Sequence, residues 1–159
     1  MIPEVDFFGA RISRLLLGDN PINGHSYVPE VWSREDMIDY YTEENVLKDL
    51  AEAEALGYTA MVPLANDFML RALWHHKLNG GGMRVIFQSY PPVDFQVNVR
   101  QMAECGPLGI YHQGTTTDSL CEAGRFDTIR DRIHMIHDAG CRAGLGTHVP
   151  ETVLRAEEE

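Results

Sequence analysis

Residues 83–107 read MRVIFQSYPPVDFQVNVRQMAECGP and contain one complete strand–helix unit. Residues 83–90 form a largely apolar run that is typical of a buried strand and ends near the polar side chain of Gln88. Apolar residues then recur at helical spacing between Phe95 and Met102, and Gly106 ends that helix. This unit sets the pattern for the rest of the chain.

Five such units are expected, with helices beginning near Thr42, Asn66, Asp94, Arg125 and Glu151. Their strands are expected at residues 11–18, 58–64, 83–90, 108–114 and 141–148. A long segment after the first strand is rich in Pro, Asn and Gly and is predicted to be a loop. Strands that alternate with helices form a parallel sheet with the helices outside it.

Two architectures fit this alternation. One is a flavodoxin-like doubly wound sheet, which needs about five strands. The other is a TIM barrel, (β/α)₈, of which five units are a part. The first strand is not followed by a Gly-rich phosphate loop, and the last helix stops after two or three turns, so we favour the barrel. The fold prediction is therefore α/β, with residues 1–159 as one incomplete barrel domain.

Composition limits the classes of partner. The 159 residues include 13 Lys and Arg against 24 Asp and Glu, a formal net charge of −11. Such a surface repels phosphate backbones, so neither nucleic acid nor an anionic membrane is expected to bind. Three cysteines without a CxxC motif indicate reduced thiols and a cytoplasmic location. The apolar run at residues 15–17 is too short for a signal peptide or a membrane span.

Polar side chains follow each predicted strand. Because the carboxyl ends of parallel strands meet at one edge of the sheet, we expect these side chains to line one mouth. They are Asp19 and Asn20, Asp67, Gln88, His112, Gln113 and Asp118, and finally Thr147 and His148.

Two histidines close consecutive predicted strands. Neighbouring strands lie about 4.8 Å apart, so His112 and His148 are expected to be close. One of them could act as a general acid, or both could bind one metal ion. The alternative interpretation is that each ring bonds a neighbouring carbonyl and stiffens a loop. The exposed-face histidines His134 and His137, and the helix-ending glycines 80–82, are expected to be structural.

The segment 140–148, GCRAGLGTH, resembles a strand of the aldo-keto reductases of the form G-x-[IV]-R-x-[IL]-G-[VL]-S-N. In that family the Ser-Asn pair holds the nicotinamide carboxamide, and Thr147 and His148 stand at the matching positions. Tyr111-His112 is similar to the family strand that ends on a catalytic histidine. The family's catalytic aspartate, tyrosine and lysine have no counterpart. Val62 stands about where the aspartate would be, Asn66 or Asp67 falls near the tyrosine, and Gln88 or Ser89 falls where the lysine ends its strand.

The resemblance implies an enzyme that acts on a small polar or carbonyl-bearing molecule, with NADP(H) as the cofactor if the chemistry is redox. His112 would be the acid/base or electrophilic group. One alternative is a divalent-metal-dependent isomerase or lyase that uses His112 and His148. Another is a non-catalytic half-barrel, completed by a partner chain or a second copy. The remaining site residues are expected to be carboxylate partners (Asp67, Asp118) or to bind substrate or cofactor (Asp19, Asn20, Gln88, Gln113, Thr147, His148).

Overall fold

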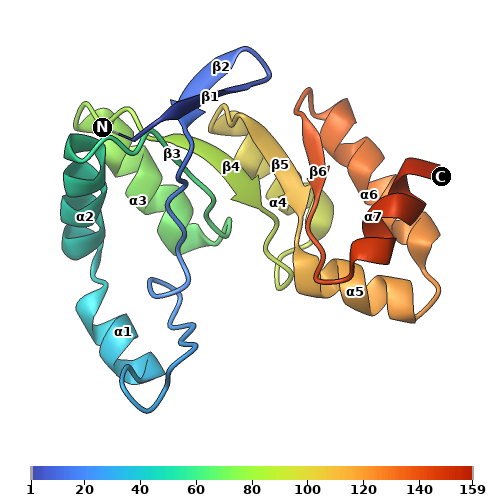
Figure 1. Ribbon diagram of the computed structural model, residues 1–159, viewed down its shortest axis with the longest axis horizontal. Helices are drawn as coiled ribbons and strands as arrows, with labels where there is room; N and C mark the ends of the chain where they lie inside the picture. Colours follow the sequence, from blue (N-terminus) through green and yellow to red (C-terminus); the bar gives the residue numbers. More distant parts are fainter. Residues whose placement is uncertain (1, 159) are drawn as a thin grey trace. The chain divides into compact units, whose positions relative to one another are not determined.

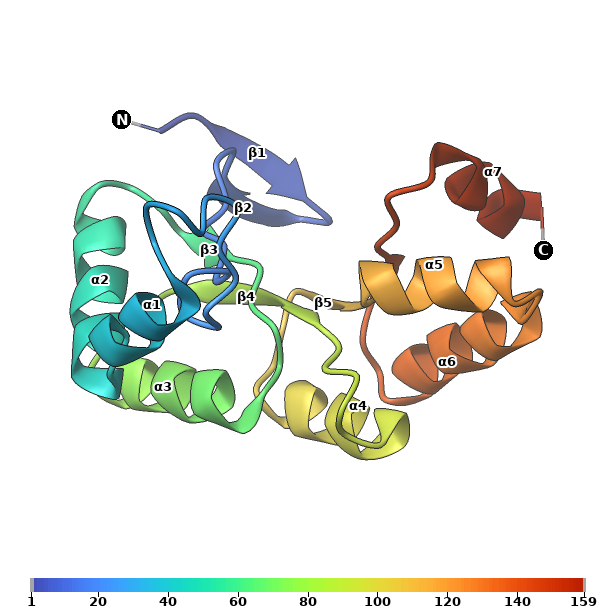
Figure 2. The same cartoon turned by 90° about the horizontal axis from the view of Figure 1, so that it is seen from below.

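The computed structural model describes residues 2–158, and Figure 1 and Figure 2 show it from two directions. The chain is an α/β protein with a parallel sheet of four strands in the order β3–β4–β5–β6, flanked by helices. The α/β class predicted from the sequence is therefore confirmed. Contacts divide the chain into two compact units, Met1–Val85 and Ile86–Glu159. Within residues 2–158, no helix is both long and apolar enough to cross a membrane.

A β-hairpin occupies the start of the first unit. Its strands β1 (Glu4–Phe7) and β2 (Ala10–Ser13) pair in antiparallel register. Phe8 and Gly9 form the turn with φ angles of 52° and 87°, and the Asp6 carboxylate accepts the Gly9 N–H at 3.2 Å. A two-residue turn with positive φ matches the twist of a hairpin.

The hairpin shows that the prediction of a parallel strand at residues 11–18 is wrong for most of this range. Residues 11–13 belong to β2 and have an antiparallel partner in β1. Leu17 alone in that range forms a parallel bridge, to Met61 of β3 (Ala60–Met61). The sequence pattern does not distinguish the two, because a hairpin strand and a buried parallel strand can both be apolar over such short lengths.

Helices of the first unit begin at side chains that cap them. The unit contains α1 (Arg34–Tyr40), α2 (Glu43–Ala55) and α3 (Asp67–Leu78). Thr42 and Asn66 accept backbone N–H bonds as the N-caps of α2 and α3, as predicted. By contrast, α1 begins in the segment predicted to be a loop, where Ser33 accepts the Asp36 N–H. The helices α2 and α3 pack side by side (Figure 1).

The second unit continues the alternation. It contains α4 (Phe95–Glu104), β5 (Gly109–His112), α5 (Gly114–Glu122), α6 (Phe126–Asp138), β6 (Ala143–Leu145) and α7 (Pro150–Glu158). The strand β4 (Arg84–Gln88) pairs through residues 84–85 with β3 and through residues 86–88 with β5. The run TTTD at residues 115–118 lies inside α5.

Helix α6 organises the core of the second unit. It packs against β5, β6, α4 and α5. Figure 2 shows α5 beside it. Ile129 and Ile136 of α6 are buried, together with Ile110 of β5 and Met102 of α4. Burying each such side chain stabilises the fold by about 1.5–3 kcal/mol. The same packing holds the carboxyl ends of β5 and β6, where the candidate site lies.

Candidate functional site

Asp19 is one of the buried polar residues of the first unit and is 3% exposed. Its Oδ2 accepts the Leu64 N–H and the Asn23 Nδ2–H, both at 2.7 Å. Burial raises the pKa of the Asp19 carboxyl, although these two hydrogen bonds oppose the rise. Asn23 also accepts an amide hydrogen from Asn66 at 2.6 Å, so the network ties the loop to the start of α3.

The other two predicted site residues of the first unit have different surroundings. Asn20 donates from Nδ2 to the Tyr27 hydroxyl at 3.1 Å, and its carbonyl accepts the His25 N–H at 2.8 Å. Asp67 is exposed in the first turn of α3, where a carboxylate interacts favourably with the positive end of the helix dipole. These contacts are typical of residues that stabilise a loop and a helix end.

His112 ends β5 and is completely buried. Its Nε2 lies 3.0 Å from Nη1 of Arg132, and its Nδ1 lies 2.7 Å from Oγ1 of Thr117. An Arg can only donate, so Nε2 accepts and the proton is on Nδ1, which donates to Thr117. Thr117 in turn donates to the Gln113 carbonyl at 3.1 Å. Both ring nitrogens of His112 therefore have partners within the protein.

The surroundings of His112 keep the ring neutral. Burial, and secondarily the positive charge of Arg132, lower the pKa of His112 from 6.5 to about 4. The Phe95 ring of α4 lies against it, with ring centroids 5.5 Å apart. All these side chains come from α4, α5 and α6, so the ring points beneath the helices. Tyr111 points to the opposite face, where its ring approaches Gly146.

The sequence predicts that His112 and His148 lie close together at one mouth of the sheet. No hydrogen bond among residues 2–158 joins the two rings, and each has its own set of partners. His112 donates and accepts inside the helix layer, whereas the side chain of His148 is 74% exposed. Of the two, His148 is the one whose ring is accessible to a ligand.

A compact cluster is formed by Asp118, Thr147 and His148. We call its two ionisable members the Asp118–His148 pair. Nδ1 of His148 lies 2.6 Å from Oδ2 of Asp118, and Oγ1 of Thr147 donates to Oδ1 at 2.5 Å. The backbone N–H of His148 adds bonds at 3.2 and 3.3 Å. Hydrogen bonds from Thr147 and His148 lower the pKa of Asp118, so it is a carboxylate.

The sequence order explains how this cluster forms. Thr147 and His148 follow β6 after Gly146, and Asp118 lies one turn into α5, which follows β5. Parallel pairing of β5 with β6, with His112 opposite Leu145, brings the two chain segments together. Gly114 permits a close approach beside them, since a Cβ there would lie 3.3 Å from Cε1 of His148.

Gln113 and Gln88 complete the predicted set. Gln113 is the N-cap of α5, and its Oε1 accepts from Thr116 N at 2.7 Å. Its own N–H donates to Ser89 Oγ at 3.0 Å, which links the ends of β4 and β5. Gln88 ends β4 opposite Tyr111 and is half-buried. Gln113 thus has a structural role at the same end of the sheet as the cluster.

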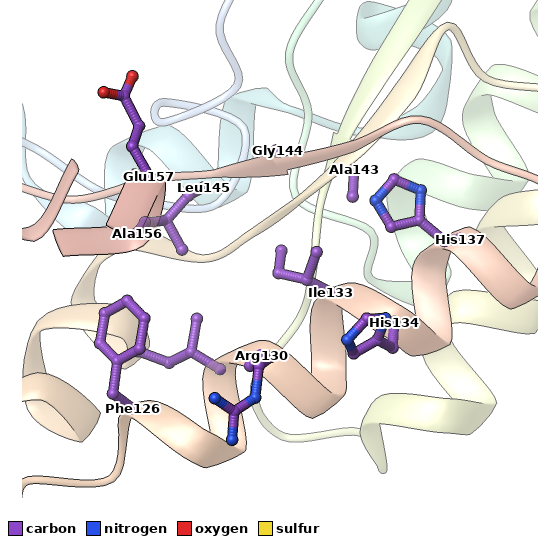
Figure 3. Close-up of a pocket in the computed structure, with 11 residues that line it drawn as sticks. Phe126, Arg130, Ile133, His134, His137, Ala143, Gly144, Leu145, Ala156 and Glu157 are labelled. Carbon is purple, nitrogen blue, oxygen red and sulfur yellow. The ribbon is translucent and has the colours of Figure 1, made fainter. Parts of the chain in front are cut away.

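Two cavities lie in the second unit, away from this cluster's residues. One has a volume of about 610 Å³ and lies between α6, β6 and α7, with Ile133 and Leu145 on its walls and His134 and His137 at its rim (Figure 3). The other, about 490 Å³, lies between α6 and residues 91–96. Within residues 2–158, no three or more metal-ligating side chains come together.

Sequence reasoning missed Arg132 and Thr117, the partners of His112. A signal for Arg132 was present, because it follows the buried Ile129 by three residues and precedes the buried Ile136 by four. A charged residue at that helical spacing lies on the buried face and needs a partner. Thr117 gave no such signal, since α5 was not expected.

The fold and site together define an α/β protein with a parallel sheet and a carboxylate-oriented histidine after its last strand. In comparisons with family profiles, curated proteins and solved structures, nothing matches the chain.

Proposed function

We propose that this protein is an enzyme acting on a small polar or carbonyl-bearing molecule, with His148 as its acid/base group. The observation that carries the proposal is the 2.6 Å contact between Nδ1 of His148 and the Asp118 carboxylate, combined with the exposure of the ring. This role replaces the acid/base role that the sequence suggested for His112, whose nitrogens are both engaged.

The chemistry of the pair supports this assignment. A carboxylate that accepts from Nδ1 fixes the tautomer, so that Nε2 carries the lone pair that accepts a proton. The same carboxylate stabilises the imidazolium that forms when Nε2 is protonated. Thr147 holds Oδ1 of Asp118, which leaves Oδ2 facing His148. A proton can therefore be taken from, or given to, a substrate at the carboxyl end of β6.

We further propose that the sheet belongs to a (β/α)₈-type barrel. Its four strands are neighbours in sequence order, and Leu17 bridges to β3 on the other side. A barrel requires this consecutive order throughout, whereas a doubly wound sheet reverses it at a switch point. Sites in barrels are built by the loops after the strands, which is where Thr147 and His148 lie.

Proton exchange tests the function directly. The protein is incubated in D₂O with a panel of small ketones and hydroxyketones, and loss of the α-proton signal is followed by NMR. We expect exchange with at least one compound and a decrease of about 10²–10⁴-fold in His148→Gln. His134→Gln, an exposed histidine elsewhere, is the matched control. Exchange that is undiminished in His148→Gln would refute the role of His148. NADPH oxidation with the same panel tests the redox form of the proposal.

A second candidate is metal-dependent chemistry, which the same pair favours. A histidine that donates to a carboxylate through Nδ1 is the usual form of a metal ligand, with Nε2 toward the ion. Titration of the protein with Zn²⁺ or Mn²⁺ in the exchange assay distinguishes the two. A stoichiometric requirement for the ion, lost in His148→Gln, would favour the metal-dependent reaction.

A further inference from the structure

Arg132 of α6 is a half-buried cation whose hydrogen-bond and ring-stacking partners are uncharged. Its Nη1 donates to the neutral His112 at 3.0 Å, and its guanidinium lies 4.9 Å from the centroid of the Phe95 ring. Within residues 2–158, no carboxylate forms an ion pair with it. Burial lowers the pKa of Arg132, which nonetheless remains protonated. The nearby Asp94 carboxylate opposes this lowering of the Arg132 pKa, but it forms no ion pair with the guanidinium, which leaves donors of Arg132 available to a ligand.

Arg132 lines a cavity of about 490 Å³ that is open to solvent. The opposite wall consists of residues 91–96, the loop after β4 and the first turn of α4, and the remaining wall is Thr128, Asp131 and Met135 of α6. The size is that of a site for a small organic molecule. We call it the Arg132 pocket.

The walls of the pocket carry both charges and apolar surface. Arg132 supplies a cation that is fixed in place by His112 and Phe95. Asp94 and Asp131 supply two carboxylates, of which Asp94 also caps α4 by accepting the Val97 N–H at 3.1 Å. Pro91, Pro92, Phe95 and Met135 supply the apolar part. The two carboxylates would repel a ligand that carries only a negative charge. Arg132 would repel a ligand that carries only a positive charge.

We propose that the Arg132 pocket binds a small zwitterion of the α-amino-acid class. Its carboxylate pairs with the guanidinium of Arg132, its ammonium faces Asp94 or Asp131, and its side chain lies against Phe95 and Met135. An arginine binds a carboxylate through two parallel N–H bonds, and one N–H used by His112 leaves enough donors for this. The proposal concerns a site other than the Asp118–His148 pair and stands independently of the proposed function.

The pocket has a built-in reporter. The positive charge of Arg132 contributes to the low pKa of His112, so a carboxylate bound to Arg132 offsets that charge and raises the pKa of His112. A ligand that bound elsewhere on the protein would leave the His112 ring unchanged. Titration of the ring by NMR, with and without ligand, therefore locates the binding.

The experiment uses free amino acids, tested singly, with acetate, phosphate and ethanolamine as single-charge probes. Binding is followed by ¹H–¹⁵N shifts of the unmodified protein and of three variants, each first shown to be folded by circular dichroism. Arg132→Gln removes the charge and keeps an amide donor for His112. Arg132→Lys keeps the charge and loses the planar two-donor edge. Arg130→Gln changes an arginine on the same helix that does not line the pocket.

We expect saturable binding of at least one amino acid, weakened at least tenfold in Arg132→Gln and several-fold in Arg132→Lys, and unchanged in Arg130→Gln. The same ligand is expected to raise the pKa of His112. The proposal is overturned if no amino acid saturates, if the Arg132 variants bind as well as the unmodified protein, or if acetate or phosphate binds as tightly as the amino acid. Should Arg132→Gln not fold, Arg132→Lys and the His112 titration decide between these outcomes.

Discussion

Replacing His112 by glutamine is expected to change how the stability of this protein depends on pH. His112 is completely buried, and its pKa falls from 6.5 to about 4 on folding. Between these two values the unfolded chain binds the proton and the native ring does not. The free energy of unfolding therefore decreases as the pH is lowered through this range, and the full effect is reached below pH 4.

The size of the effect follows from the two pKa values. The difference between 6.5 and about 4 corresponds to about 3 kcal/mol in total. About 2 kcal/mol of it is lost between pH 7 and pH 5. Glutamine offers an acceptor to Arg132 and a donor to Thr117 without titrating, so His112→Gln lacks this loss. Other titrating groups affect both proteins alike and cancel when the two are compared.

The measurement is urea unfolding, followed by far-UV circular dichroism at pH 7 and pH 5. The unmodified protein is expected to lose about 2 kcal/mol more than His112→Gln between the two pH values. His137→Gln, which changes an exposed ring on α6, serves as the control and should behave like the unmodified protein. Equal losses in the unmodified protein and His112→Gln would show that the ring is not held neutral by burial and Arg132, and the reasoning would be wrong.

Three further predictions concern other parts of the chain. Gly81→Ala should destabilise the protein by about 1–3 kcal/mol in thermal or urea unfolding, because its Cβ would lie 2.2 Å from Nε2 of the buried His76. Gly82→Ala, whose nearest contact would be 3.8 Å away, should change stability little, and equal effects of the two would contradict the packing argument. Asp19→Asn should raise the melting temperature at pH 7, since burial raises the pKa of this carboxyl and disfavours its charge; a lower melting temperature would count against it. Thr147→Val should reduce the exchange activity and Thr147→Ser should retain it, whereas equal activities would exclude a positioning role for the hydroxyl.

Local chemistry made several elements readable from the sequence. Asn66 and Thr42 start helices because their side-chain oxygens can accept N–H groups that the helix leaves unpaired, and this needs no tertiary contact. Gly106 ends α4 with a positive φ, which glycine adopts without strain. The hairpin at Phe8-Gly9 and the helix α5 were missed, because a short apolar or polar run does not reveal its partner.

The sequence by itself determined the alternation of strands and helices, the start and end of most helices, and the presence of Thr147 and His148 after the last strand. Only the tertiary structure decided which histidine is accessible. His112 and His148 look alike in the sequence, since each follows an apolar run. Strand pairing and helix packing place Arg132, Thr117 and Phe95 around the first and Asp118 beside the second. The environment of a side chain, and with it the pKa and the chemistry, depends on neighbours that are distant in the sequence.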